Sequence, residues 1–80
     1  MTIGEAVRQR ILELCQERQI TVNRLALISG ITQSTLNNII SGRNHSTTIS
    51  TVQKICDGLE IPIAEFFQSP LFLSLEQEIK

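Results

Sequence analysis

Two short runs of apolar residues at helical spacing lie in the middle of the chain, separated by Gly30-Ile31-Thr32 alone. Glycine suits the left-handed residue that ends a helix, and threonine is a favoured N-cap of the next one. The pattern therefore predicts two short helices, 22–29 and 33–40, joined by a tight turn. Their inward positions are Leu25, Ala26, Ile28, Leu36, Ile39 and Ile40.

Residues 4–19 predict an earlier helix with one apolar stripe. Thr2 is its expected N-cap, and Glu5 three residues later completes a capping box. The buried stripe is Val7, Ile11, Leu14 and Cys15. The opposite face is expected to lie in solvent and carries Arg8, Arg10, Glu13, Gln16 and Glu17.

Two further helices are predicted after the central pair. The first covers 49–58, is capped by Thr48 and is expected to weaken at Asp57 and Gly58. Pro62 suits the first turn of a short fifth helix that presents Ile63, Phe66 and Phe67. The buried stripe of 49–58 and its continuation is Ile49, Val52, Ile55, Cys56 and Leu59. Residues 1–69 are therefore predicted to form one all-α domain, a five-helix bundle.

The segment 70–80 is too apolar for a terminus that lies unpacked in solvent. Phe72, Leu75 and Ile79 recur at helical spacing, whereas Leu71, Leu73 and Leu75 alternate as in a strand. Period alone leaves both forms open. In either form the segment has apolar surface to bury, against its own bundle or against a second copy. It is treated as an apolar C-terminal tail and a candidate dimerisation segment.

Composition excludes several classes of protein. Eighty residues suit one domain, and a chain that is 41% apolar with three Phe as its only aromatics predicts an aliphatic core. Cys15 and Cys56 are expected there as free thiols, and a single His leaves no zinc site. Charges throughout the first 20 residues exclude a signal peptide or membrane span, so a soluble, cytoplasmic protein is expected. No residue set suits catalysis, a cofactor or a small-molecule ligand, which predicts a protein that is not an enzyme.

Charge is unevenly distributed, although its sum is small. The net charge is −1, and all eight acids precede Arg18 or follow Cys56. A long segment without carboxylates suits an approach to phosphate groups, because a misplaced acid would repel them. Chance clustering is the alternative.

With Leu36 and Ile39 turned inward, the helix 33–40 keeps an outward face that is polar and uncharged. Asparagine is a poor helix former, so two together in mid-helix lower the stability of the helix. That loss of stability suggests that the two side chains have a function. The alternative is an ordinary solvated surface. The outward residues are Gln33, Ser34, Asn37 and Asn38, with Thr35 at the margin.

These features resemble the phage-repressor and Cro-type helix-turn-helix domains, the XRE family. The similarity runs through residues 21–67, as TVNRLALISGITQSTLNNIISGR and then TISTVQKICDGLEIPIAEFF, while 4–19 fits by pattern only. The resemblance implies that the second and third helices form the helix-turn-helix and that 33–40 enters the DNA major groove. Ile40 and Thr47 depart from the family, where an acid and a proline are frequent.

The resemblance also implies which residues contact double-stranded DNA. Base contacts carried over by position are Gln33, Ser34 and Asn38, with Thr35 and Asn37 beside them. Phosphate contacts carried over are Thr21, Val22, Arg43, Asn44 and His45. Arg24 is a third phosphate candidate, and a solvated arginine is its alternative, as an ordinary loop residue is for His45.

The implied role is that of a transcriptional regulator, a repressor in preference to an activator. The resemblance favours a homodimer, formed through residues 68–80 or the fifth helix. The rival interpretation is a protein-interaction module or antitoxin-like partner that keeps the fold with little or no DNA binding. Low basic content favours that rival.

Overall fold

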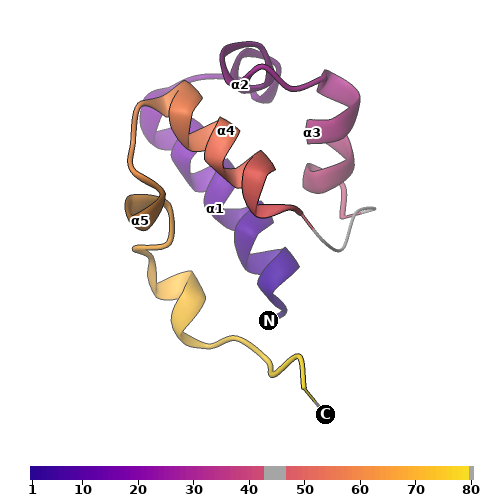
Figure 1. The fold of residues 1–80 in the computed structure, drawn as a ribbon, viewed down its shortest axis with the longest axis vertical. Helices are drawn as coiled ribbons and strands as arrows, with labels where there is room; N and C mark the ends of the chain where they lie inside the picture. The colour runs from indigo at the N-terminus through magenta and orange to yellow at the C-terminus, as the bar shows by residue number, and fades with distance from the viewer. Residues whose placement is uncertain (43–46, 80) are drawn as a thin grey trace.

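The computed structural model describes residues 1–42 and 47–79, which contain only helices and connecting segments. The prediction of an all-α, five-helix fold is confirmed (Figure 1). None of the described helices is long and apolar enough to cross a membrane. The elements are α1 (Ile3–Arg18), α2 (Val22–Ser29), α3 (Gln33–Ile40), α4 (Ile49–Leu59), α5 (Ile63–Phe66) and the 3₁₀ helix η1 (Pro70–Leu73).

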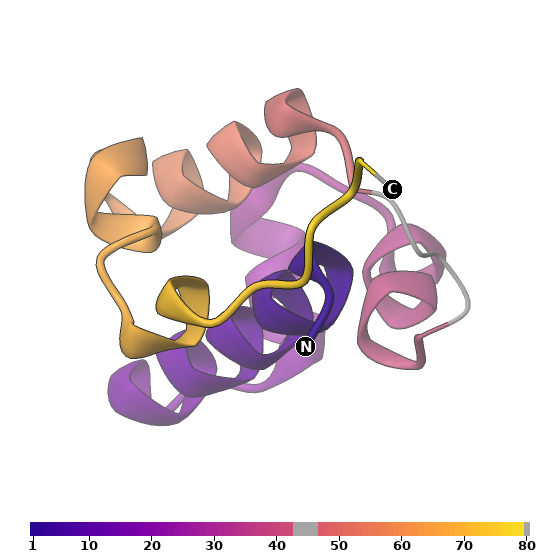
Figure 2. The ribbon, with the colours of Figure 1, turned by 90° about the horizontal axis from the view of Figure 1, so that it is seen from below.

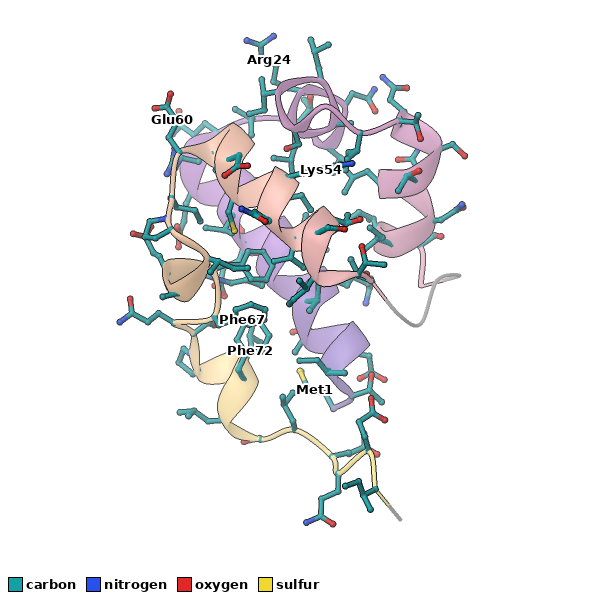
Figure 3. All side chains as sticks on the ribbon, in the orientation of Figure 1. Met1, Arg24, Lys54, Glu60, Phe67 and Phe72 are labelled. Atoms are coloured by element: carbon teal, nitrogen blue, oxygen red, sulfur yellow. The ribbon has the colours of Figure 1, made fainter. Side chains whose placement is uncertain are left out.

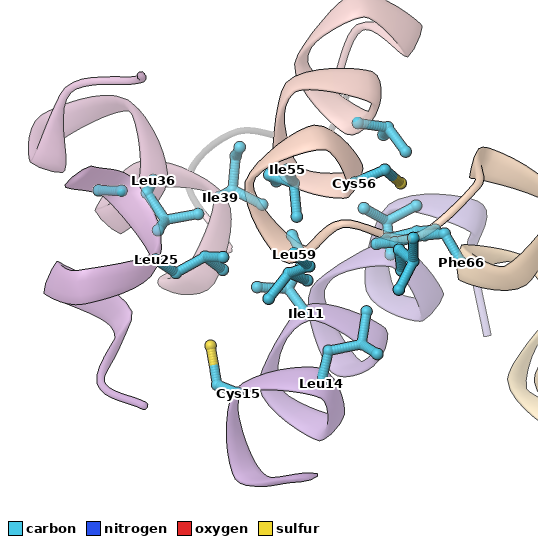
Figure 4. Packing of buried hydrophobic residues seen from close by; sticks show 14 residues of the cluster. Ile11, Leu14, Cys15, Leu25, Leu36, Ile39, Ile55, Cys56, Leu59 and Phe66 are labelled. Carbon is cyan, nitrogen blue, oxygen red and sulfur yellow. The ribbon is translucent and has the colours of Figure 1, made fainter. Parts of the chain in front are cut away.

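One hydrophobic core lies between the five α-helices. The helix α2 packs against α4 and α3, and α1 contacts α2, α3 and η1. In Figure 1 α2 lies across the top of the bundle, and α3 lies to one side. Cys15 and Cys56 belong to the core as free thiols, as predicted. Figure 4 shows the cluster, whose fully buried members include Ile11, Leu25, Leu36, Ile55 and Phe66.

Threonine begins four of the helices. Each hydroxyl accepts a hydrogen bond from the backbone N–H three residues later, at 3.0 to 3.2 Å. A cap of this kind contributes about 1 kcal/mol, so the helix starts are fixed locally. All four predicted caps are confirmed: Thr2, Thr21, Thr32 and Thr48.

Three connections share one form, in which a left-handed residue and an isoleucine precede the N-cap of the next helix. The isoleucine N–H donates to the carbonyl five residues earlier, at 3.0 to 3.2 Å, as in a Schellman motif. The left-handed residues are Gln19, Gly30 and Glu60, with φ of 55, 69 and 58°. Ile20, Ile31 and Ile61 follow them and pack against the core. The motif keeps these connections short, so the helices that they join stay close.

Arg10 and Ile49 are two of the side chains that do not lie where the sequence analysis expected them. The expectation that Arg10 lies in solvent is wrong, because its side chain is 6% exposed. Its guanidinium donates to the carbonyls of Phe66 (2.6 Å) and Glu65 (2.9 Å), the last ones of α5. Ile49, expected in the core, is 64% exposed. It lies on the correct stripe of α4 but one turn before the part that meets the other helices.

The tail folds back on its own bundle. The Phe72 ring packs against that of Phe67, with 5.0 Å between centroids. Beyond η1 the Glu76 N–H donates to the Met1 carbonyl at 2.9 Å, so the tail crosses the N-terminal end of α1 (Figure 2). The tail forms the short 3₁₀ helix η1, and its remaining described residues, 74–79, are neither helix nor strand, so neither of the two forms left open is adopted over the whole segment. Two apolar side chains of the tail stay exposed, Leu73 (84%) and Ile79 (87%).

Candidate nucleic-acid interface

The helix α3 is attached to the bundle by one side only. Leu36 is fully buried and Ile39 is 3% exposed, so these two side chains fix which face points inward. The short turn at Gly30 holds the start of α3 next to α2. The opposite face of α3 is therefore presented outward by packing, and its direction does not depend on its own polar residues.

The structure brings the five predicted base-contact residues together on this outward face. Four of them are exposed, namely Gln33, Ser34, Thr35 and Asn37. Asn38 is half-buried, so Asn38 lies at the margin of the face where the sequence analysis placed Thr35. The face offers amide and hydroxyl groups and carries no charge, which suits hydrogen bonding to neutral groups that both donate and accept.

One hydroxyl on this face is held in place. Thr32 Oγ1 accepts the Thr35 N–H at 3.0 Å and donates to Thr35 Oγ1 at 2.8 Å. Because Thr35 accepts in that bond, its own hydroxyl proton stays available for an outside acceptor. The N-cap of α3 thus orients a donor in the first turn of the helix.

The predicted phosphate contacts are only partly described. Thr21 Oγ1 accepts the Arg24 N–H at 3.0 Å, so the cap does not engage the N–H of Val22. A helix leaves its first N–H groups without partners inside the helix, and they favour anions. The Arg24 side chain is exposed at the outer side of α2 (Figure 3). Arg43, Asn44 and His45 lie outside the described residues.

No acidic residue occurs in α2 or α3. Asp57 and Glu60 belong to the C-terminal end of α4, and Glu60 lies on the opposite side of the molecule from α3 in Figure 3. Lys54, exposed on α4, adds a cation to the acid-free segment. The two helices α2 and α3 thus offer no carboxylate that would repel a polyanion, in line with the uneven charge distribution of the sequence.

Sequence reasoning missed one residue that contacts α3. Arg8, expected on the solvent face of α1, donates from Nε to the carbonyl oxygen of Ile40 at 2.6 Å. The side chain is half-buried between the two helices. Spacing within α1 gave no signal for this contact, because the acceptor is a backbone atom of a distant helix.

A short helix packed across another, with an uncharged polar face turned outward, defines a helix-turn-helix domain of the DNA-binding class. The chain belongs to the family of Cro/C1-type HTH DNA-binding domains, whose sequence profile matches residues 10–69. The expected family is confirmed. It is a family of DNA-binding domains and not of enzymes, which also confirms the expectation of no enzyme.

Two curated relatives come from Bacillus subtilis (strain 168). The uncharacterized HTH-type transcriptional regulator RghRB is 35% identical over 54 residues, which are 68% of this chain and 39% of that protein. The HTH-type transcriptional repressor RghR is 31% identical over 58 residues, 72% of this chain and 43% of that protein. The chain therefore spans less than half the length of these relatives.

A solved structure shares the fold. The crystal structure of the prophage Lp1 protein 11 superposes with a TM-score of 0.81 at 36% sequence identity. The match covers 94% of this chain and 99% of that one.

Proposed function

We propose that this chain binds double-stranded DNA sequence-specifically and places α3 in the major groove. The observation that carries the proposal is the outward face of α3, which is polar, uncharged and held from beneath by Leu36 and Ile39. A major groove presents donors, acceptors and thymine methyl groups at base edges, and an α-helix fits its width.

The side chains of that face suit base edges better than phosphates. A glutamine or asparagine amide can pair with both N6 and N7 of adenine, and one such pair contributes about 1–3 kcal/mol of discrimination. Gln33 and Ser34 are in the first turn of α3 and exposed, so they are the first candidates. Thr35, Asn37 and Asn38 complete the proposed base contacts.

Phosphate contacts are proposed to come from α2 and the loop after α3. The N–H groups at Thr21 and Val22, the guanidinium groups of Arg24 and Arg43, and the side chains of Asn44 and His45 would fix the orientation of the domain. If each arginine neutralises one phosphate, a dimer neutralises about four, and the salt slope of log Kobs is about −4. That value corresponds to modest affinity.

The proposed role is transcriptional regulation, with repression favoured over activation. Both curated relatives are named HTH-type transcriptional regulators or repressors. A homodimer would bind two half-sites about 34 Å apart. Within the tail and α5, the exposed apolar groups proposed for such a contact are Leu73 and Ile79 of the tail and Ile63 of α5, which is 39% exposed.

The proposal is tested by selecting genomic fragments on the immobilised chain and titrating the recovered duplexes by fluorescence anisotropy at low salt. We expect saturable binding to the selected duplex and at least tenfold weaker binding to a shuffled duplex of the same composition, which is roughly the discrimination that one bidentate base pairing supplies. A chain that binds neither duplex and responds to no salt change would contradict DNA binding and favour a protein-interaction module.

A further inference from the structure

We infer that Arg8 on α1 is a positioning residue that sets the orientation of α3 for DNA, an inference that rests on the proposed function. Its Nε donates to the carbonyl oxygen of Ile40, the last residue of α3, at 2.6 Å. The two residues are 32 positions apart in sequence. Among the described residues this is the only hydrogen bond that joins α3 to another helix.

Arg8 adds a side-chain donor at the C-terminal end of α3, where the Asn37 and Ile39 carbonyls accept from the Ser41 and Gly42 N–H groups. Ser41, its C-cap, has a right-handed backbone with φ −77° and ψ −8°, and the left-handed residue comes only at Gly42. The last carbonyls of a helix lack partners within it and carry the negative end of the helix dipole. A guanidinium there supplies a donor and a favourable charge together, and charged donors make the stronger hydrogen bonds.

The hydrogen bond matters for recognition because it holds one end of α3 while the proposed base contacts lie at the other end. The N-terminal turn carries Gln33 and Ser34, while the buried Leu36 and Ile39 form the support about which the helix can tilt. A helix of eight residues is about 12 Å long, so a shift of about 1 Å at one end tilts it by about 5°. Binding residues need positions held to about 0.5 Å, so Arg8 acts on base contacts without touching DNA.

The experiment compares three variants. Arg8→Met keeps the apolar stem but removes the donor, Arg8→Lys keeps a donor, and Arg18→Met removes the same charge from the exposed end of α1. Affinity for the selected and shuffled duplexes is measured over a range of salt. We expect Arg8→Met to weaken the selected duplex about five- to tenfold and the shuffled one less than about twofold, with an unchanged salt slope. Arg8→Lys should recover part of the affinity, and Arg18→Met should leave the ratio of the two affinities unchanged.

Several outcomes would overturn the inference. Equally weakened binding to both duplexes, with a salt slope reduced by about 0.9, would make Arg8 a group that neutralises a phosphate directly. An unchanged ratio of affinities in Arg8→Met would also overturn it.

Amide hydrogen exchange of the DNA-free chain separates failure of this inference from failure of the proposed function. In Arg8→Met the amides of residues 37–42 should exchange faster, while those of α2 and α4 keep their protection. Uniformly faster exchange would show general destabilisation and overturn the inference. If the wild-type chain selects no duplex, the proposed function fails, and the exchange result alone decides whether Arg8 fixes α3.

Discussion

The exposed residues of α3 and the arginine of α2 are expected to contribute differently to DNA binding. Gln33→Ala should lower affinity for the selected duplex about fivefold or more and relax base preference, because it removes a side chain that reads a base edge. Arg24→Ala should weaken selected and shuffled duplexes alike and reduce the salt slope by about 0.9 for each phosphate that is no longer neutralised. Anisotropy titrations over a salt series measure both quantities. Affinity that falls equally for the selected and shuffled duplexes in both variants would contradict these separate roles. The same contrast is expected between Asn38→Ala, which should relax base preference, and Arg43→Ala, which should weaken both duplexes alike.

The buried thiols give a second prediction for single residues. Burial raises the pKa of Cys15 above its ordinary value of 9.0, and burial together with the Asp57 charge raises the pKa of Cys56. Above pH 9 the unfolded thiols lose protons that the folded ones keep, so the free energy of unfolding should fall as pH rises through that range. Below pH 9 the stabilising contribution of the two buried thiols is fully present.

Chemical denaturation at several pH values measures this effect. The double variant Cys15→Ala/Cys56→Ala is the control, because it removes both thiols and keeps every other side chain. A smaller decrease in stability above pH 9 is expected for the variant. The same decrease in both proteins would mean that the thiols do not contribute.

At the scale of helices and turns, Glu60 holds a left-handed conformation at φ 58° as the C-cap of α4. A side chain with a Cβ costs about 1–2 kcal/mol there, whereas glycine adopts this conformation without strain. Glu60→Gly should therefore raise the free energy of unfolding by about 1 kcal/mol. Glu60→Ala removes the carboxylate but keeps the Cβ, so it should be close to the wild type. A glycine variant no more stable than the alanine variant would refute the argument.

Gly58 lies where α4 crosses α2, and the helix continues past it to Leu59. A Cβ at this position would lie 2.6 Å from Ser29 Oγ and 2.9 Å from the Ile28 carbonyl oxygen. Although alanine favours helix formation, Gly58→Ala should lower the free energy of unfolding by about 1–3 kcal/mol through overpacking. Thermal and denaturant unfolding measure the decrease. Adding Ser29→Ala should recover only part of it, because the backbone carbonyl cannot move aside; full recovery would point to the hydroxyl alone.

Features that depend on residues close in sequence could be predicted, and features that depend on contacts with residues far away in sequence could not. The threonine caps, the turn at Gly30 and the outward direction of Gln33 follow from spacing and cap chemistry within a few residues. The left-handed caps at Gln19 and Glu60 gave no signal, because neither is the glycine that usually marks such a position. Arg8 and Arg10 were placed in solvent because their acceptors are backbone carbonyls of α3 and α5, far away in sequence.

At the scale of the whole molecule, the packing of the tail also could not be predicted from local sequence. Its apolar pattern predicted burial, but two surfaces were available, the chain's own bundle and a second copy. In the structure Phe72 packs against the Phe66 and Phe67 rings of the chain's own bundle, while Leu73 stays exposed. Removing the tail after Ser69 would therefore disturb the bundle as well as any dimer, so point substitutions separate the two roles.

We predict that Leu73→Glu converts a dimer to a monomer without lowering the melting temperature, and that Ile63→Glu, if α5 forms the interface, also does so but lowers the melting temperature. Leu73 is 84% exposed in the single chain, so a charge there costs little in the monomer but opposes burial between copies, whereas Ile63 is only 39% exposed and loses packing within the monomer. Phe72→Ala is the matched control, because removing its packed ring should lower stability by about 2 kcal/mol or more. Sedimentation equilibrium over a concentration series, alone and with a two-half-site duplex, measures the mass. A wild-type chain that stays monomeric even on that duplex would leave each domain to bind a half-site alone. A dimer mass that is unchanged in both glutamate variants would remove these surfaces from the dimer.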